Sequence, residues 1–151
     1  MHILVTGGAG YIGSHTVRAL LAQGHRVLVL DNLSRGHRQA VPAEVTLITE
    51  DIHHIDTVRD IMELNKIEAV VHFAAHSQVG ESMDNPTIYY DNNIVGSYCL
   101  LEAARQAGVQ YFVFSSTAAV YGEPEKIRIT EDMPYKPTSV YGQTKLMIER
   151  M

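Results

Sequence analysis

An apolar run that breaks into closely spaced glycines constrains this chain more than any other feature of its sequence. Residues 2–6 read HILVT, and residues 7–13 continue as GGAGYIG. The glycines match two spaced patterns, G-x-G-x-x-G from Gly8 and G-x-x-G-x-x-G from Gly7, which both end at Gly13. Glycines at such a turn permit a tight bend, close approach of the backbone to a pyrophosphate, and tight packing of helix on strand. A plain flexible turn is the alternative, but the helix pattern that follows favours a nucleotide-binding turn.

An acidic residue closes the next apolar run and strengthens this interpretation. Asp31 ends the segment RVLVLD, 18 residues beyond Gly13. A carboxylate at that place accepts the ribose hydroxyls of an adenosine and repels a 2′-phosphate, so it favours NAD over NADP. Arg35 and Arg38 leave NADP open, because a nearby arginine can receive that phosphate. A surface aspartate that caps a loop is the other alternative.

Short apolar runs alternate with longer amphipathic segments along the chain, which is typical of parallel βα units. The runs are continuous rather than alternating, and this indicates a sheet that is covered on both faces. We therefore predict an α/β fold with a doubly wound parallel sheet, the Rossmann arrangement. The predicted strands are 2–6, 26–31, 45–49, 69–75 and 110–115. The first predicted helix is 11–23, with Ile12, His15, Ala19 and Ala22 near one face; the second is capped by Asp56 and runs to about Asn65; the third is 86–107; and the last is capped by Ser139. A loop is predicted over 121–138.

Composition excludes several classes of protein. In 151 residues, 46% are hydrophobic and 19% are charged, which predicts one globular domain rather than disorder. The 12 Lys and Arg against 17 Asp and Glu give a net charge of −5, so neither nucleic acid nor an anionic membrane is an expected partner. No apolar run approaches the roughly 20 residues of a spanning helix. Cys99 is the only cysteine, which fits a reducing compartment, and we expect a cytoplasmic protein.

Histidines do not predict a metal site in this sequence. His53 and His54 are adjacent, and adjacent histidines do not easily chelate one ion. His72 and His76 lie four apart near a strand end, which holds them far from each other. Since no third ligand is spaced for either pair, we expect no bound metal.

A tyrosine and a lysine on the last predicted helix form a candidate catalytic pair. Tyr141 and Lys145 lie four residues apart, so both side chains project from one helix face. A phenol with a pKa of about 10 is a poor base at neutral pH, and a nearby ammonium favours its phenolate. A hydroxyl of Ser115, Ser116 or Thr117, after the fifth predicted strand, could bond a substrate oxygen. These groups suggest hydride chemistry at an alcohol carbon, and a solvated helix face is the alternative for the pair.

Six segments spread over the chain form a combined pattern. They read TGGAGYIGSH, DNLS, HFAA…VGES, YYDNN, SSTAAVYGE and SVYGQTKLMIE. Together they resemble the extended short-chain dehydrogenase/reductases, and among these the enzymes that epimerise sugar nucleotides. The resemblance covers the whole chain, from Met1 to Met151. It implies an NAD-dependent enzyme that 4-epimerises a UDP-hexose, UDP-glucose or UDP-galactose, through a transient 4-keto intermediate.

The resemblance also implies the roles of individual residues. Tyr141 is implied as the catalytic base and acid. Lys145 is implied to hold the nicotinamide ribose and to favour the phenolate of Tyr141, and Thr117 to bond the 4′-hydroxyl of the sugar. The implied NAD contacts, with the adenine at Asp51 and Ile52, are Gly7, Gly10, Tyr11, Ile12, Gly13, Asp31, Asn32, Asp51, Ile52, Phe73, Ala74, Ala75, Ser77, Asn92, Tyr141 and Lys145.

Two departures from related patterns bear on the implied activity. Ser77 stands where some epimerases carry a lysine, so we expect no cationic phosphate contact there. Ala118 and Ala119 follow Thr117, where the related sugar-nucleotide dehydratases carry an aspartate and a glutamate. Loss of water needs an acid and a base, and two alanines supply neither. The sequence therefore argues against a dehydratase.

The resemblance further implies a domain organisation. It implies additional strands and a C-terminal substrate domain, to which nothing in residues 1–151 corresponds, so we expect a truncated chain with an NAD-binding domain over 1–151. A non-catalytic fragment that binds NAD or dimerises is the alternative. The helix from Pro86 and the last helix resemble the dimer-forming pair of the family, which implies a homodimer with a UDP-sugar as substrate.

Overall fold

The structure is a computed structural model that describes residues 1–124 and 128–151. Contacts among these residues divide the chain into two compact units. The first unit holds Met1–Ala74 and Cys99–Ser115, and the second holds Ala75–Tyr98 and Ser116–Met151. The strands are β1 (His2–Thr6), β2 (Arg26–Leu30), β3 (Thr46–Ile48), β4 (Ala69–His72) and β5 (Tyr111–Phe114); the helices are α1 (Tyr11–Ala22), α2 (Ile55–Leu64), α3 (Val79–Asp84), α4 (Pro86–Tyr89), α5 (Gly96–Gln106) and α6 (Val140–Glu149).

In the described part of the chain, the strands of the first unit form one parallel sheet with the order β3-β2-β1-β4-β5. The chain starts at β1, builds outward to β3, and then returns to the other side of β1 with β4. This reversal beside β1 is the strand order of a Rossmann sheet, which confirms the predicted doubly wound fold. Each predicted strand is present, but β4 ends at His72 and not at residue 75.

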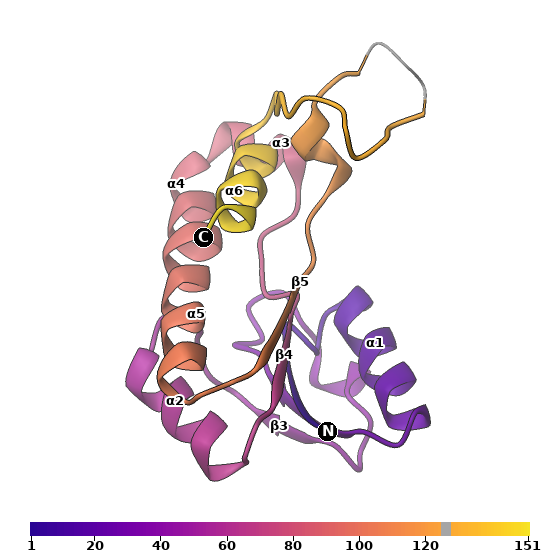
Figure 1. Ribbon diagram of the computed structural model, residues 1–151, viewed down its shortest axis with the longest axis vertical. Helices are drawn as coiled ribbons and strands as arrows, with labels where there is room; N and C mark the ends of the chain where they lie inside the picture. Colours follow the sequence, from indigo (N-terminus) through magenta and orange to yellow (C-terminus); the bar gives the residue numbers. More distant parts are fainter. Residues whose placement is uncertain (125–127) are drawn as a thin grey trace. The chain divides into compact units, whose positions relative to one another are not determined.

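Two apolar cores cover the two faces of this sheet. Leu4 and Val70 point to one face, where they join a buried cluster with residues of α2 and α5. Ile3 and Val5 point to the other face, where they join a cluster with Val17 of α1. Figure 1 shows α1 on one side of the strands and α2 with α5 on the other. Because alternate residues of a strand face opposite ways, a continuously apolar strand fills both cores.

The four residues expected near one face of the first helix do not form its buried face. Ile12, His15, Ala19 and Ala22 are all exposed, and the buried residues of α1 are instead Gly13, Ser14 and Val17. The helix packs through its glycine side, since Gly13 brings its backbone against the preceding turn. Val17, Leu20 and Leu21 pack against the same core, so their apolar spacing marks the buried face of the helix.

The second helix starts two residues earlier than predicted. The residue before α2 is His54, and Asp56 lies within the first helical turn rather than at the cap. A carboxylate in the first turn still interacts favourably with the positive end of the helix dipole.

In the second unit, the helix predicted for 86–107 has an irregular middle. It runs as α4, then a π-helical segment at Tyr90–Val95, then α5, which continues into the first unit. A short helix, α3, precedes it and was absent from the prediction. The last helix begins as predicted, because Ser139 Oγ accepts a hydrogen bond from the Gly142 N–H at 3.1 Å. Residues 125–127 of the loop predicted at 121–138 lie outside the described residues.

Two glycines determine the shape of the turn between β1 and α1. Gly7 has φ +71°, and a Cβ there would lie 2.6 Å from the backbone nitrogen of Ala74. A Cβ on Gly13 would lie 2.2 Å from the carbonyl oxygen of Gly7. Both contacts are with backbone atoms, which cannot rotate away. The turn therefore requires glycine at both positions.

Among the described residues, no helix combines the length and the apolar character that crossing a membrane requires.

We expect Gly13→Ala to destabilise the fold by about 1–3 kcal/mol, because its methyl group forces the turn away from the helix. Gly80→Ala is the matched control, since a Cβ at Gly80 meets no atom within 4 Å and the residue has no positive φ. Urea denaturation measures both changes. Equal unfolding midpoints for Gly13→Ala and the unchanged protein would contradict the packing described for the turn.

Candidate functional site

The candidate site begins at the amino end of α1. The helix starts at Tyr11, directly after the glycine turn, and its first turn contains no acidic residue. The first N–H groups of a helix have no partner within the helix, and the helix dipole makes this end positive. Tyr11 and Ile12, two predicted cofactor contacts, are 83% and 60% exposed. The arrangement offers backbone donors to an anion beside a turn that has no side chains in the way.

Asp31 supports this turn from the end of β2. Its side chain is buried, with Oδ2 accepting the Ala9 N–H and Oδ1 accepting the Leu33 N–H, each at 2.9 Å. The sequence predicts a carboxylate that faces a ribose, and it carries no signal for this structural role. Each carboxylate oxygen can accept a second hydrogen bond, so both roles are compatible. The buried negative charge also repels a phosphate group at that place.

The chain after β4 lies against the glycine turn. The Phe73 N–H donates to the Thr6 carbonyl at 2.9 Å, and the nitrogen of Ala74 lies close to the α-carbon of Gly7. A buried side-chain hydrogen bond, Thr6 Oγ1 to His72 Nδ1 at 2.7 Å, joins the last residues of β1 and β4. The structure thus brings together predicted cofactor contacts that follow these two strands: Gly7 after β1, and Phe73 and Ala74 after β4. Nothing in the sequence pattern had indicated the pair of Thr6 and His72.

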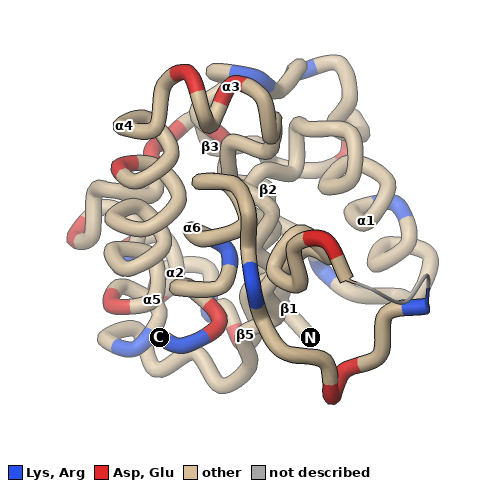
Figure 2. Tube along the Cα trace, turned by 90° about the horizontal axis from the view of Figure 1, so that it is seen from above, with Lys and Arg blue, Asp and Glu red and all other residues tan. Residues whose placement is uncertain are grey.

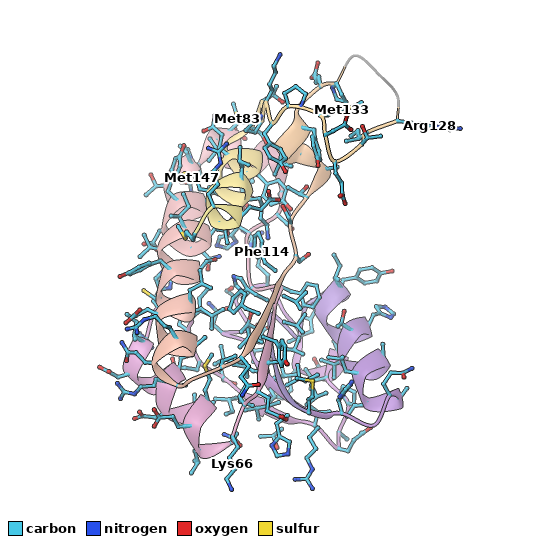
Figure 3. The ribbon with its side chains drawn as sticks, in the orientation of Figure 1. Lys66, Met83, Phe114, Arg128, Met133 and Met147 are labelled. Carbon is cyan, nitrogen blue, oxygen red and sulfur yellow. The ribbon has the colours of Figure 1, made fainter. Side chains whose placement is uncertain are left out.

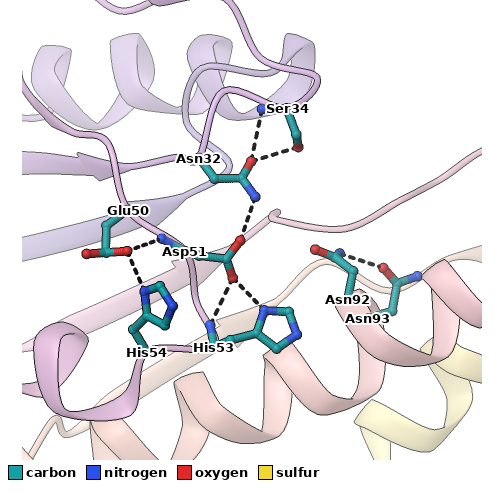
Figure 4. Close-up of polar contacts among 8 residues, drawn as sticks. All are labelled: Asn32, Ser34, Glu50, Asp51, His53, His54, Asn92 and Asn93. Carbon is teal, nitrogen blue, oxygen red and sulfur yellow. Dashed lines mark hydrogen bonds and ion pairs between the residues drawn. The ribbon is translucent and has the colours of Figure 1, made fainter.

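A polar chain links the ends of β2 and β3. Asn32 Nδ2 donates to Asp51 Oδ2 at 2.8 Å, and His53 Nδ1 lies 2.5 Å from Asp51 Oδ1 (Figure 4). Partial burial raises the pKa of Asp51, but the hydrogen bonds from His53 and Asn32 outweigh it and hold the pKa below its ordinary value. Asp51 is therefore an ionised acceptor at neutral pH. Ile52, the other predicted adenine contact, has its side chain buried in the core.

In the second unit, α6 carries the predicted Tyr141 and Lys145. The Lys145 Nζ lies 6.0 Å from the centroid of the Tyr141 ring, so the pair shares one helix face as predicted. Lys145 is 4% exposed, and this burial lowers its pKa from 10.5 to about 8. A lysine with a lowered pKa holds its proton less tightly than a surface lysine does. Such a shift is typical of functional sites.

Two buried residues that sequence analysis missed hold α6 in place within the second unit. Ser82 Oγ of α3 accepts the Tyr141 N–H at 3.1 Å. Asn93, in the π-helical segment, donates to Thr144 Oγ1 at 3.1 Å and also bonds both backbone groups of His76. π-Helical segments often occur at functional sites, because they turn a side chain out of helical register. The doublet Asn92–Asn93 within a helical pattern was the available signal.

The remaining predicted residues also lie in the second unit. Thr117 Oγ1 accepts the Ala119 N–H at 3.2 Å, which leaves its own hydroxyl proton available for donation. Thr117 lines a groove of about 420 Å³, together with residues that include Ser116 and Glu149, whose side chains bond each other.

The other predicted cofactor contacts of the second unit differ in exposure and bonding. Ser77 is exposed, Ala75 is half-buried, and Asn92 donates to the side chain of Asn93. In the described residues, no group of three or more His, Cys, Asp and Glu is arranged to hold a metal ion.

Comparison with known proteins gives consistent matches. Residues 3–151 match the NAD dependent epimerase/dehydratase family. The chain is 52% identical to the UDP-glucose 4-epimerases of Corynebacterium glutamicum and Lactobacillus helveticus over 149 and 151 residues, which are 99% and 100% of this chain. These stretches are 45% and 46% of those two proteins, so the chain spans about half the length of the curated relatives that it matches.

Solved structures match equally well. A crystal structure of a UDP-glucose 4-epimerase superposes with a TM-score of 0.97 and 48% identity, over 100% of this chain and 46% of that one. The Thermus thermophilus UDP-glucose 4-epimerase in complex with NAD gives a TM-score of 0.95 and 43% identity, over 99% of this chain and 49% of that one.

The pKa of Lys145 predicts a particular dependence of stability on pH. Below pH 8 the lysine is charged in both states, and between pH 8 and 10.5 it is neutral when folded and protonated when unfolded. Stability rises with pH where the unfolded state binds more protons, so this group adds about 2–3 kcal/mol over that window. We expect Lys145→Met to lose this rise, while the exposed Lys136→Met keeps it. Urea denaturation at pH 7, 8.5 and 10 tests the difference, and parallel pH profiles for all three proteins would contradict the lowered pKa.

Proposed function

Because the chain belongs to the NAD dependent epimerase/dehydratase family, we propose that it binds NAD and carries the catalytic residues for 4-epimerisation of a UDP-hexose such as UDP-glucose or UDP-galactose. One observation carries the proposal. The match to the family is continuous over residues 3–151, so it includes both the glycine turn and the Tyr141–Lys145 pair. We further propose that residues 1–151 act as the NAD-binding domain.

We propose NAD rather than NADP as the cofactor. The supporting observation is the buried carboxylate of Asp31, since a 2′-phosphate placed against it would meet a like charge. In the first unit, the proposed NAD contacts are Gly7, Gly10, Tyr11, Ile12, Gly13, Asp31, Asn32, Asp51, Ile52, Phe73 and Ala74. In the second unit, the proposed contacts are Ala75, Ser77, Asn92, Tyr141 and Lys145.

The proposed mechanism assigns one task to each reacting side chain. When bound, NAD would supply the hydride acceptor for C4′ of the sugar and the hydride donor for the return to the other face. Tyr141 takes the proton of the 4′-hydroxyl while the hydride leaves, and gives it back in the reverse step. Lys145 holds a ribose and favours the phenolate of Tyr141 through its charge. Thr117 donates its hydroxyl proton to the sugar oxygen and so orients it.

Tyr141→Phe tests the proposed catalytic step. Incubating the chain with NAD and UDP-galactose should yield UDP-glucose, and the variant should lose this turnover by about 10²–10⁴-fold, the usual contribution of general acid–base catalysis. Binding of NAD by the variant should stay within about threefold of the original, since the phenyl ring keeps its place. Tyr111→Phe, on the exposed face of β5, is the matched control.

Two outcomes contradict the proposal in different ways. Bound NAD with no turnover in the unchanged chain would favour a cofactor-binding module without catalysis. Turnover that is equal in Tyr141→Phe and Tyr111→Phe would remove Tyr141 from the reaction.

We also propose that the chain forms a homodimer through the second unit. Val95 and Tyr98 are 46% and 56% exposed, on the π-helical segment and the start of α5. Met147 of α6, labelled in Figure 3, is 46% exposed. The Tyr90 hydroxyl donates to Gln143 Oε1 at 3.3 Å, which joins these elements into one surface. Exposed apolar side chains gathered on neighbouring helices are typical of protein interfaces.

Replacing the apolar surface with charge tests the dimer. We expect the mass in solution to correspond to a dimer, and Tyr98→Glu to increase the dissociation constant at least about tenfold, because a buried unpaired charge is costly. Thr57→Glu, at an exposed position of α2 in the first unit, is the control for added charge. Light scattering coupled to size exclusion measures the mass, and a monomer for the unchanged chain would contradict the proposal.

For the location of the protein we propose the cytoplasm, supported by the single cysteine, which suits a reducing compartment. Figure 2 shows basic residues spread among acidic ones rather than gathered in one stripe, which does not favour a nucleic-acid partner.

A further inference from the structure

Two histidines in the connection from β3 to α2 each bond a carboxylate, although no part of the proposed reaction uses them. His53 Nδ1 lies 2.5 Å from Asp51 Oδ1, and His54 Nδ1 lies 2.7 Å from Glu50 Oε1 (Figure 4). The two pairs differ in their surroundings. The side chain of His54 is 62% exposed, whereas that of His53 is 26% exposed. An exposed pair of this kind contributes little, so His53 is the more informative residue.

Asp51 is held from two opposite sides. Its Oδ1 accepts hydrogen bonds from both the backbone N–H and the imidazole of His53, at 3.0 and 2.5 Å. Its Oδ2 accepts one from Asn32 Nδ2 at 2.8 Å. Asn32 is itself held, because its Oδ1 accepts the N–H and the hydroxyl of Ser34 at 3.0 and 2.7 Å. The orientation of the carboxylate is therefore determined by its neighbours and not by solvent.

This arrangement controls which acceptor position Asp51 can offer to a ligand. A carboxylate has about four acceptor positions, two on each oxygen. The two hydrogen bonds from His53 occupy both positions of Oδ1, and Asn32 occupies one of Oδ2. The remaining position is on Oδ2, and the Asp51 side chain is 31% exposed. A donor N–H of a ligand is the group that fits a fixed anionic acceptor, and the 6-amino group of adenine is such a donor.

We propose that His53 is a positioning residue for adenine: by occupying Oδ1 of Asp51, it directs Oδ2 to the 6-amino group and makes the site selective for 6-amino over 6-oxo purines. The inference rests on the proposed function, since it takes NAD as the ligand. It adds a residue that the proposed mechanism does not contain. A 6-oxo purine presents an acceptor at the same place, so it meets the carboxylate without a hydrogen bond.

The test compares NAD with nicotinamide hypoxanthine dinucleotide, which differs from NAD by a 6-oxo group in place of the 6-amino group. Isothermal titration of the full chain gives both dissociation constants. We expect the unchanged chain to prefer NAD by about tenfold or more, the usual effect of a hydrogen bond to a charged group. His53→Ala should reduce the preference to below about threefold, and His53→Asn should restore it, because an asparagine amide can donate from the place of Nδ1. His54→Ala is the matched control and should keep the full preference.

The outcomes separate this inference from the proposed function. If His53→Ala weakens both dinucleotides equally, or changes neither, then His53 does not act through the adenine and the inference is wrong. Asp51→Asn should shift the preference toward the 6-oxo base, and an unchanged preference in that variant would also overturn the inference while NAD binding stands. If the unchanged chain binds neither dinucleotide, the proposed function fails and the inference fails with it. Circular dichroism of each variant checks that it folds.

Discussion

The backbone contact between the turn after β1 and the chain after β4 is the constraint on which the first unit depends. At this place the strand order reverses, so the two segments leave neighbouring strands in opposite directions around the sheet. The α-carbon of Gly7 lies against the backbone of Phe73 and Ala74, and the carbonyl of Gly7 lies against Gly13. Because backbone meets backbone, no side chain fits between them. The amino end of α1 is consequently held close to the sheet and open to a ligand.

Two buried ionisable side chains, Asp31 beside this turn and Lys145 on α6, are accommodated in different ways. Asp31 is buried and accepts two backbone N–H groups, and so it ties the turn to β2. Lys145 is buried on α6, and removal from water lowers its pKa. In the second unit, Ser82 and Asn93 satisfy polar groups of α6 that burial would otherwise leave costly. Buried polar groups thus determine where the candidate catalytic side chains stand.

The sequence predicted the order of the elements and most of the candidate residues, but it failed where side chains carry no pattern. The glycine turn and Asp31 were predicted because strand, turn and acid each leave a local signal. The face of α1 that Ile12, Ala19 and Ala22 share is exposed, and the apolar spacing of Val17, Leu20 and Leu21 was the signal for the buried face. The π-helical segment was missed, because six residues are too few for a sequence pattern to distinguish a π-helix from an α-helix. Ser82, Asn93 and His53 were missed, since a polar residue does not indicate whether it is bonded or solvated.

By itself, the sequence determined the fold class, because continuously apolar strands must be covered on both faces and the glycines allow only one kind of turn. It also determined that Tyr141 and Lys145 share a helix face, since that follows from their spacing. Only the tertiary structure decided the state of these groups. Atoms from several segments of the chain bury Lys145 and so lower its pKa. Two separate segments likewise supply Asn32 and His53, which bond the two carboxylate oxygens of Asp51. Spacing along a helix determines the face from which a side chain projects, whereas its burial and hydrogen bonds depend on neighbouring residues that only folding brings close.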